Sequence, residues 1–297
     1  MVRLLGPADV RELAARLDLN PTKKLGQNFV HDPNTVRKIV AAADVGPGER
    51  VVEIGPGLGS LTFGLIEAGA SVTAIEIDER LARLLPETAA AMGAPEGSLE
   101  VVSADALEVT PRSLREALGA PSSRVAPAAT DAGDPTALVA NLPYNVSVPV
   151  LLHFLETFPR LERALVMVQS EVGERLAARP GSKVYGGPSA KAAWYADVRL
   201  AGGVSRQIFW PVPNVDSVLV RLDRHETPGS DAERVRTFAL VDAAFGQRRK
   251  MLRQSLAAVL GPRASTVIEA GGVDPTSRGE VLEIGDFLSI ARAVPAP

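Results

Sequence analysis

The sequence predicts an α/β protein with a mainly parallel sheet and a small helical domain at its C-terminal end. Up to about residue 170, short runs rich in β-branched residues alternate with helical stretches, which is typical of parallel strands joined by right-handed crossovers. A glycine loop directly follows the first such run. From about Asp231 onward only helical periodicity remains. We therefore expect one domain over 1–226, with an N-terminal helical extension, and a second, all-helical domain over 227–297.

Local patterns place the elements of the first domain in order. An amphipathic pattern predicts a helix over 10–17. Asp32 followed by Pro33 predicts the N-cap and first turn of a helix that continues to residue 43. The strands of the sheet are predicted at 51–54, 71–77, 99–103, 138–140 and 164–169. The helices between them are predicted at 60–67, 79–92 and 149–157.

The later part of this domain and the loop before the fourth predicted strand have a different pattern. Residues 193–200 and 217–222 are typical of an antiparallel pair of strands. Between them, 209–214 contains two prolines, which have no amide hydrogen to donate and therefore exclude a central strand. Ala, Pro, Ser and Asp dominate 119–136, so we expect a disordered surface loop there.

Composition excludes several classes of protein. The absence of cysteine excludes disulfides, thiolate metal ligands and a thiol nucleophile. The three histidines have no spacing that indicates a metal site, and we expect no metal. No apolar run approaches the roughly 20 residues of a membrane span, and the N-terminus lacks the apolar centre of a signal peptide. We therefore expect a cytoplasmic protein without membrane contact, and a monomer because no heptad pattern is present.

The glycine loop follows a strand and precedes a helix, which is the local arrangement of Rossmann-like cofactor sites. Its spacing is Gly55-x-Gly57-x-Gly59, and Ser60 stands where a dinucleotide fingerprint requires its third glycine. Glu53 before the loop would repel a pyrophosphate but tolerates a cation. The loop therefore indicates S-adenosylmethionine, which has a sulfonium centre and no phosphate; the alternative is a tight turn without a ligand.

Acidic residues end the next two predicted strands. Glu76 lies about 20 residues after the loop, where a carboxylate can accept both ribose hydroxyls of a cofactor. Asp105 ends the third strand and can accept a hydrogen bond from an adenine amine. Asp78 is better explained as a helix N-cap. Acidic residues at corresponding positions at the ends of three strands favour a cofactor site over a tight turn without a ligand.

A second motif predicts the chemistry. Asn141, Leu142, Pro143 and Tyr144 follow the fourth predicted strand, on the same edge of the sheet as the glycine loop. The Asn141 side chain and the carbonyl before Pro143 can accept both hydrogens of an adenine exocyclic amine, so that its lone pair turns toward a methyl donor. Tyr144 can stack on the flipped base, and Phe209 is a candidate second stacking face. The alternative is a loop whose aromatic side chains are ordinary core.

Basic residues are clustered although the net charge is -3. A local basic face on a neutral protein suits contact with a structured nucleic acid. We expect a helix over 245–256 that presents four of these residues, although a solvated charged helix is the usual explanation of such a run and a mobile lid is an alternative near residue 180. The candidates for RNA contact are Lys23, Arg175, Lys183, Arg248, Arg249, Lys250 and Arg253.

With these motifs together, the chain resembles the small-subunit (16S) ribosomal RNA adenine dimethyltransferases. The matching segments are 25–29, 53–59, 141–144, 181–186, 209–217 and 245–250. Many methyltransferases share the glycine loop, whereas the combination of 25–29, 141–144 and 245–250 is far more specific. The chain departs from the family's usual lysine at Asn214 and threonine at Met251, and 119–136 is an unusual insertion.

The resemblance implies a Rossmann-like, S-adenosylmethionine-dependent methyltransferase. Its implied reaction is transfer of two methyl groups to each of two adjacent adenosines near the 3′ end of 16S rRNA, in an assembling small subunit. Two alternatives remain: a large-subunit methyltransferase of the antibiotic-resistance type, and an assembly factor whose methylation is incidental. By resemblance, the residues that line the cofactor site are Asn28, Val30, Gly55, Glu76, Asp105 and Asn141.

Overall fold

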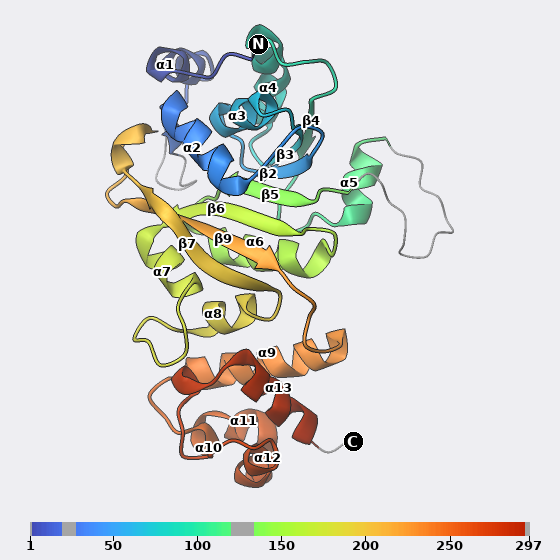
Figure 1. Ribbon diagram of the computed structural model, residues 1–297, viewed down its shortest axis with the longest axis vertical. Coiled ribbons are helices and arrows are strands. Elements are labelled where there is room, and N and C mark those ends of the chain that lie inside the picture. The colour runs from blue at the N-terminus through green and yellow to red at the C-terminus, as the bar shows by residue number, and fades with distance from the viewer. Residues whose placement is uncertain (1, 20–27, 120–133, 295–297) are drawn as a thin grey trace. The chain divides into compact units, whose positions relative to one another are not determined.

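The computed structural model describes residues 2–19, 28–119 and 134–294, and the chain divides into two compact units (Figure 1). The first comprises Met1–Gly173 and Leu200–Asp223, and the second comprises Glu174–Arg199 and Arg224–Pro297. This division differs from the expected boundary at 226/227, because Glu174–Arg199 belongs to the second unit. The reason is packing: Tyr185 lies in the same buried cluster as residues of the C-terminal helices.

A seven-stranded sheet has the order β4-β3-β2-β5-β6-β9-β7. The five strands from β4 to β6 pair in parallel, and β9 runs antiparallel to β6. All predicted strands occur, with ends shifted by a few residues. Their bounds are β2 (Arg50–Ile54), β3 (Ser71–Glu76), β4 (Leu99–Ser103), β5 (Ala137–Asn141), β6 (Arg163–Gln169), β7 (Ala196–Val204) and β9 (Ser217–Arg224).

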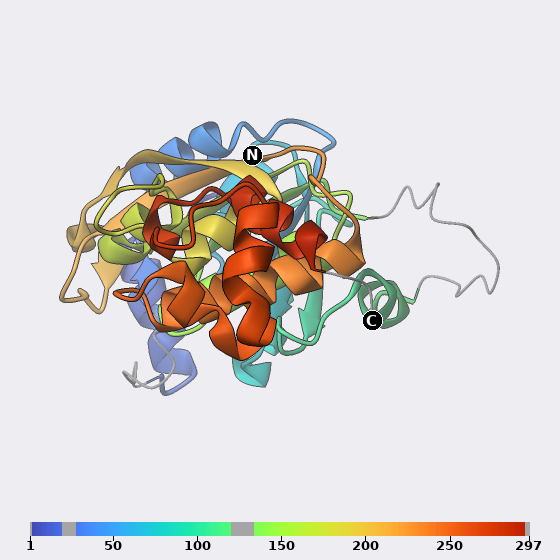
Figure 2. The same cartoon turned by 90° about the horizontal axis from the view of Figure 1, so that it is seen from below.

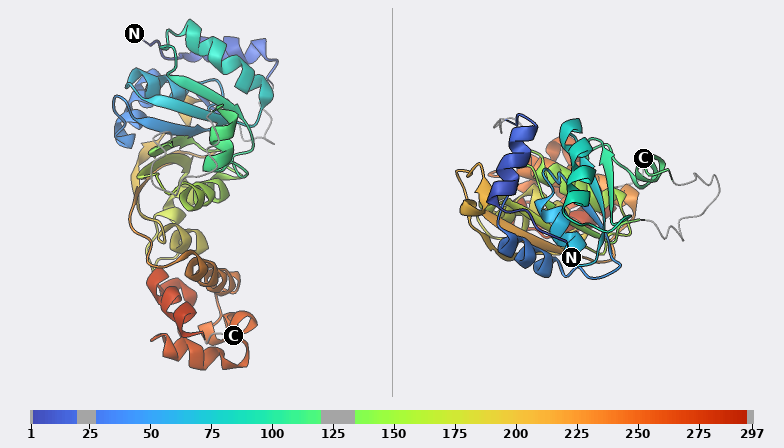
Figure 3. Two further views of the ribbon diagram at one scale, coloured as in Figure 1. Left: turned by 90° about the vertical axis from the view of Figure 1, so that its right-hand side faces the viewer. Right: turned by 90° about the horizontal axis from the view of Figure 1, so that it is seen from above.

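Helices lie on both faces of this sheet (Figures 1 and 3). The predicted start of the second helix is confirmed: Pro33 is its first residue, and the Asp32 carboxylate accepts a hydrogen bond from the Thr35 amide at 2.9 Å. The helices before and between the strands are α1 (Pro7–Arg16), α2 (Pro33–Ala43), α3 (Ser60–Glu67), α4 (Glu79–Ala91), α5 (Pro111–Ala117), α6 (Ser147–Thr157) and α7 (Ser170–Leu176).

The proline-containing segment stays outside the central sheet, as predicted. Its first two residues form β8 (Phe209–Trp210), which pairs antiparallel with β1 (Phe29–Val30) in a separate two-stranded sheet. The aromatic rings of Phe29 and Trp210 stack with their centroids 6.5 Å apart. This small sheet attaches the segment after residue 27 to the segment before β9. Most of the predicted loop over 119–136 lies outside the described residues.

The second unit is mainly helical, and Figure 2 shows its helices grouped together. Its longest helix begins at a capping box in which Ser230 and Glu233 satisfy each other's backbone amides. Among the described residues, no helix is long and apolar enough to cross a membrane, and no cluster of acidic and histidine side chains could hold a metal ion. The helices are α8 (Gly187–Ala192), α9 (Asp231–Gly246), α10 (Leu252–Ser255), α11 (Ala257–Leu260), α12 (Ala264–Ala270) and α13 (Ile284–Ala293).

The predicted helix over 245–256 is wrong. Helix α9 ends at Gly246, and a turn leads to α10, which has only four residues. The backbone amides of Leu252 and Arg253 donate to the carbonyls of Ser277 and Pro275, at 2.8 and 3.0 Å. Because these amides bond to a distant segment, they are not available for a helix that continues from α9.

Close packing of α2 against α3 yields a stability prediction. A Cβ atom added at Gly64 of α3 would lie 2.3 Å from the Val36 side chain of α2. Alanine normally stabilises a helix relative to glycine by about 1 kcal/mol. At Gly64 we expect the opposite: overpacking should lower the free energy of unfolding by about 1–3 kcal/mol, measured by urea denaturation.

The matched control for this test is Gly285→Ala. Gly285 lies in α13, and a Cβ added there meets nothing within 4 Å. Its replacement should leave the free energy of unfolding unchanged or raise it. Equal effects of the two substitutions would contradict the packing argument.

Candidate active site

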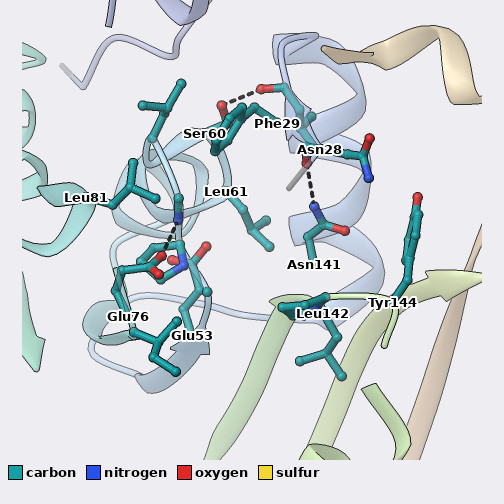
Figure 4. A pocket seen from close by; sticks show the side chains of 17 residues that line it. Asn28, Phe29, Glu53, Ser60, Leu61, Glu76, Leu81, Asn141, Leu142 and Tyr144 are labelled. Atoms are coloured by element: carbon teal, nitrogen blue, oxygen red, sulfur yellow. Dashed lines mark hydrogen bonds between the residues drawn. The ribbon is translucent and has the colours of Figure 1, made fainter. Parts of the chain in front are cut away.

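A pocket of about 770 Å³, including its open mouth, lies in the first unit at the carboxyl ends of β2, β3 and β5 (Figure 4). Parallel pairing brings these three strand ends to one edge of the sheet. Figure 4 shows Glu53 and Glu76 on one side of the pocket and Asn141 and Tyr144 on the other. Other lining residues are Asn28, Phe29, Val30, Gly55, Pro56, Gly57, Leu58, Ser60, Leu61, Ile77, Leu81, Leu142 and Pro143.

The glycine loop forms the floor of this pocket. Gly57 has a φ of 59°, and a Cβ added there would lie 2.9 Å from the Phe29 ring, so both backbone conformation and space require glycine. The Gly57 amide donates to Glu76 Oε2 at 3.1 Å. Ser60 Oγ, in the first turn of α3, donates to the Val30 carbonyl. These contacts attach the loop to β3 on one side and to β1 on the other.

Glu53 is almost completely buried beneath the loop. Its carboxyl accepts a hydrogen bond from Thr62 Oγ1 at 2.6 Å. Burial raises the pKa of Glu53 to about 8, the hydrogen bond from Thr62 opposes this, and the nearby charge of Glu76 adds to it. The site therefore favours a proton on Glu53 near neutral pH, and a cation close to it would favour the carboxylate. A phosphate at the same place would repel the Glu53 carboxylate instead of stabilising it.

Glu76 is also buried, at the end of β3. Its Oε1 accepts from the Asp78 amide at 3.0 Å and its Oε2 from the Gly57 amide. Burial raises the pKa of Glu76, while these two backbone hydrogen bonds lower it. Each carboxylate oxygen keeps further acceptor capacity, so Glu76 can still accept hydroxyl donors from a ligand in the pocket.

Asp105 lies in an adjoining hollow rather than in the pocket itself. The hollow shares Gly55, Glu76, Ile77 and Pro143 with the pocket. Asp105 Oδ1 accepts a hydrogen bond from the Leu107 amide at 2.9 Å. Glu76 lines both the pocket and this hollow, so it connects Asp105 to the pocket.

Two apolar residues that the sequence patterns did not single out also line this hollow. Ile77 is 62% exposed and Leu107 is 38% exposed, and both line the hollow. Ile77 directly follows Glu76, and Leu107 follows Asp105 by two positions, so closeness to these acidic residues is the signal in the sequence that could have indicated them. An exposed isoleucine at the end of a core strand is a surface to which a flat apolar ligand can bind.

Asn141 ends β5 and faces the glycine loop because β5 pairs with β2. Its Nδ2 donates to the Asn28 carbonyl at 3.1 Å, which fixes the orientation of the carboxamide. No described residue donates a hydrogen bond to its Oδ1. Asn28, which only the resemblance indicated, therefore has a defined contact with the residue at the centre of the second motif.

The rest of this motif surrounds Asn141. The amide of the buried Leu142 donates to the Met167 carbonyl at 3.1 Å. The Pro143 ring lies over the glycine loop, 3.7 Å from where a Cβ added at Gly55 would stand. Tyr144 is half-buried, and its hydroxyl lies 3.3 Å from Ser217 Oγ. Burial raises the pKa of Tyr144, and the hydrogen bond with Ser217 partly offsets this.

The structure does not bring Phe209 into this set. Its side chain is fully buried in the core of the first unit, in β8 beside Val30, and it does not line the pocket. In this arrangement it offers no exposed face to a base. The prediction of a second stacking residue is therefore corrected: packing of the small sheet orients the ring toward the core.

The predicted RNA-contacting residues fall into two groups in the structure. Lys23 lies outside the described residues. Arg248 is half-buried and bonded within the second unit: its guanidinium donates to the carbonyls of Ser182, Lys183 and Tyr185 and pairs with Glu280 at 2.9 Å. The other candidates are exposed in the same unit: Arg175, Lys183, Arg249, Lys250 and Arg253.

The raised pKa of Glu53 makes stability depend on pH. Because the folded state favours the protonated form, this contribution is complete below the ordinary pKa of 4.5 and is lost as the pH rises toward about 8. Between about pH 5 and pH 9, at roughly 1.4 kcal/mol per pKa unit, the free energy of unfolding should fall by a few kcal/mol more for the wild type than for Glu53→Gln. Urea denaturation at several pH values measures this, and parallel curves would contradict it.

The comparisons with known proteins agree with this geometry. Residues 19–295 match the family described as ribosomal RNA adenine dimethylase. A protein of Leifsonia xyli named ribosomal RNA small subunit methyltransferase A is 60% identical, over 98% of each chain. A Thermobifida fusca protein of the same name is 56% identical, over 99% of this chain and 97% of its own.

Two solved structures have the same fold. The 23S rRNA methyltransferase ErmE is 26% identical with a TM-score of 0.60, over 90% of this chain and 99% of that one. A dimethyladenosine transferase from Plasmodium falciparum is 24% identical with a TM-score of 0.68, over 88% and 95%. Together with the family match, which spans both motifs of the pocket, these findings show that the chain belongs to the ribosomal RNA adenine dimethylase family.

Proposed function

We propose that this protein dimethylates the exocyclic N6 amines of two adjacent adenosines near the 3′ end of 16S rRNA, with S-adenosylmethionine as methyl donor. The observation that carries the proposal is the position of Asn141 and Tyr144 across one pocket from the glycine loop. The names of relatives 56% and 60% identical support the small subunit as the target.

The residues of the pocket fit S-adenosylmethionine. Glu53 is a buried acid whose carboxylate form a nearby positive charge would favour, which suits a cationic ligand and disfavours a phosphate. Glu76 at the end of β3 is placed to accept ribose hydroxyls. The exposed Ile77 and the carboxylate of Asp105 suit an adenine, by apolar contact and by a hydrogen bond to its amine. Asn28, Val30, Gly55 and Gly57 complete the proposed cofactor site.

S-adenosylmethionine, when bound, supplies an electrophilic methyl group. The protein's own residues prepare the nucleophile, an amine whose lone pair is delocalised into the adenine ring. Asn141 Oδ1 and the Leu142 carbonyl, which accept no hydrogen bond from a described residue, would each accept one amine hydrogen. Both hydrogens are then held on the side away from the donor, so the lone pair points toward the methyl group.

Positioning supplies most of the rate in this scheme. Pro143 fixes the backbone that carries the Leu142 carbonyl, and Tyr144 would stack on the flipped base. The contact from Asn141 Nδ2 to the Asn28 carbonyl holds the acceptor in place before the substrate arrives. No strong base is needed, because the amine loses its proton after it has been methylated.

The second unit would contact the rRNA backbone through its exposed basic residues. Electrostatic contact with phosphates is independent of sequence, so it can hold a structured RNA while the pocket selects the base. We expect the protein to act as a monomer in the cytoplasm. The residues proposed for this contact are Arg175, Lys183, Arg249, Lys250 and Arg253, with Lys23 as a further candidate.

Replacement of Asn141 tests the reaction and its target. A substitution that removes the Asn141 side-chain carbonyl removes an acceptor for the adenine amine. It should reduce methyl transfer from S-adenosylmethionine to undermethylated small subunits by about a hundredfold or more. The product should be dimethyladenosine in 16S rRNA. The control is Asn34→Ala, an exposed asparagine in α2, which should leave the rate unchanged.

The same assay separates the alternatives. Large subunits and naked 16S rRNA are tested in parallel with small subunits. Label in large-subunit rRNA would place the protein with the resistance methyltransferases. Absence of label on every RNA, with binding to the small subunit retained, would favour an assembly factor and refute the proposed reaction.

Two neighbouring arginines of the second unit should behave differently. Arg249 is exposed, so Arg249→Gln should weaken binding to rRNA and reduce the slope of log affinity against log salt by about one, with unchanged stability. Arg248 is bonded within the unit, so Arg248→Gln should lower the free energy of unfolding by about 1–3 kcal/mol. Salt-dependent binding and thermal denaturation measure the two effects, and a reversed pattern would contradict both assignments.

A further inference from the structure

Tyr144 is held from a strand that takes no part in the cofactor site. Its hydroxyl lies 3.3 Å from Ser217 Oγ, and Ser217 is the first residue of β9. Ser217 is only 1% exposed, whereas Tyr144 is half-buried at the pocket. A buried hydroxyl without a hydrogen-bond partner is unfavourable, so the pair stabilises one orientation of the tyrosine ring.

The backbone fixes the position of Ser217 on both sides. Ser217 pairs with Gln169 in the antiparallel register of β6 and β9. The preceding carbonyl, that of Asp216, accepts hydrogen bonds from the Ser170 amide at 3.1 Å and from Ser170 Oγ at 2.9 Å. The Asp216 side chain in turn accepts from the Arg206 amide at 2.9 Å. The serine hydroxyl is therefore attached to a well-ordered strand end and cannot easily follow a moving ring.

A stacking residue gains from such a fixed partner. Tyr144 lies in the turn between β5 and α6, where the side chain borders an open pocket and can rotate. A base that stacks on a mobile ring must order it at the moment of binding, which reduces the fraction of productive encounters. A ring whose plane is already set avoids this loss.

We propose that Ser217 is a positioning residue for methyl transfer, which holds the Tyr144 ring in the plane required to stack on the target adenine. The proposal rests on the proposed function. It gives the antiparallel strand β9 a role at the site, although the parallel strands β3 and β5 end in Glu76 and Asn141, which would contact cofactor and amine. It also assigns a role to the last residue of the motif over 209–217, which the reaction scheme above does not use.

The first test does not require activity. The chain has three tyrosines, so protein labelled with 3-fluorotyrosine should give three fluorine resonances, and Tyr144→Phe identifies the one from Tyr144. Ser217→Ala should shift or broaden the Tyr144 resonance and leave those of Tyr185 and Tyr195 unchanged. Ser217→Thr keeps the hydroxyl and should restore the original signal. An unchanged Tyr144 resonance in Ser217→Ala would overturn the proposal.

The second test is kinetic. Ser217→Ala should lower kcat for methyl transfer to small subunits about three- to tenfold, with little change in KM for the RNA and in the Kd of S-adenosylmethionine measured by calorimetry. Tyr144→Phe should have a similar effect, and the double variant should be no worse than either single variant. Ser255→Ala is the matched control: this serine is equally buried, in α10 of the second unit, and its loss should not change kcat.

The outcomes distinguish the two levels of the argument. If the wild type is active but the two substitutions have additive effects, only the role of Ser217 is overturned. The same holds if Ser217→Ala leaves kcat unchanged. Wild type inactive on every RNA would overturn the proposed function and with it the positioning role of Ser217 in methyl transfer. A shifted Tyr144 resonance together with non-additive kinetics would support the proposal.

Discussion

The parallel pairing of β5 with β2 is the constraint on which the site depends. In parallel strands the carboxyl ends meet at one edge, so the loop after Ile54 and the loop after Asn141 come together although about 80 residues separate them in the chain. A shift of this register by one residue would turn Asn141 to the other face of the sheet. The core of the first unit, by fixing the register, therefore also fixes the distance between the proposed donor and acceptor sites.

Two buried acidic residues set the electrostatics of the pocket. Glu53 and Glu76 lie beneath and beside the glycine loop, away from bulk water, where a charge is stabilised only by a close partner. Thr62 and two backbone amides supply part of this stabilisation. The remainder can come from a ligand, and a sulfonium cation supplies it whereas a phosphate does not. Under the proposed function, a loop geometry that binds anions in other proteins would here accommodate a cation.

The second unit uses arginine in two ways. Arg248 donates to three backbone carbonyls and to Glu280, and so connects the turn after α9 to the segment around Lys183. Because these contacts occupy the N–H donors of its guanidinium, Arg248 stabilises the fold of the unit. Its neighbours Arg249 and Lys250 are exposed and free of that role. The internal contact of one arginine thereby orders the turn that presents the other basic residues to solvent.

The sequence by itself determined the elements and the two motifs, because local rules govern them: Asp32 and Pro33 start a helix, and glycines at positive φ shape the loop after Glu53. It also indicated the family, since short motifs in a fixed order are specific. The tertiary structure alone decided that Phe209 is buried, that Glu174–Arg199 packs with the C-terminal helices, and that Ser217 contacts Tyr144. These depend on partners distant in sequence, and no local pattern reports which side chains will meet across a core.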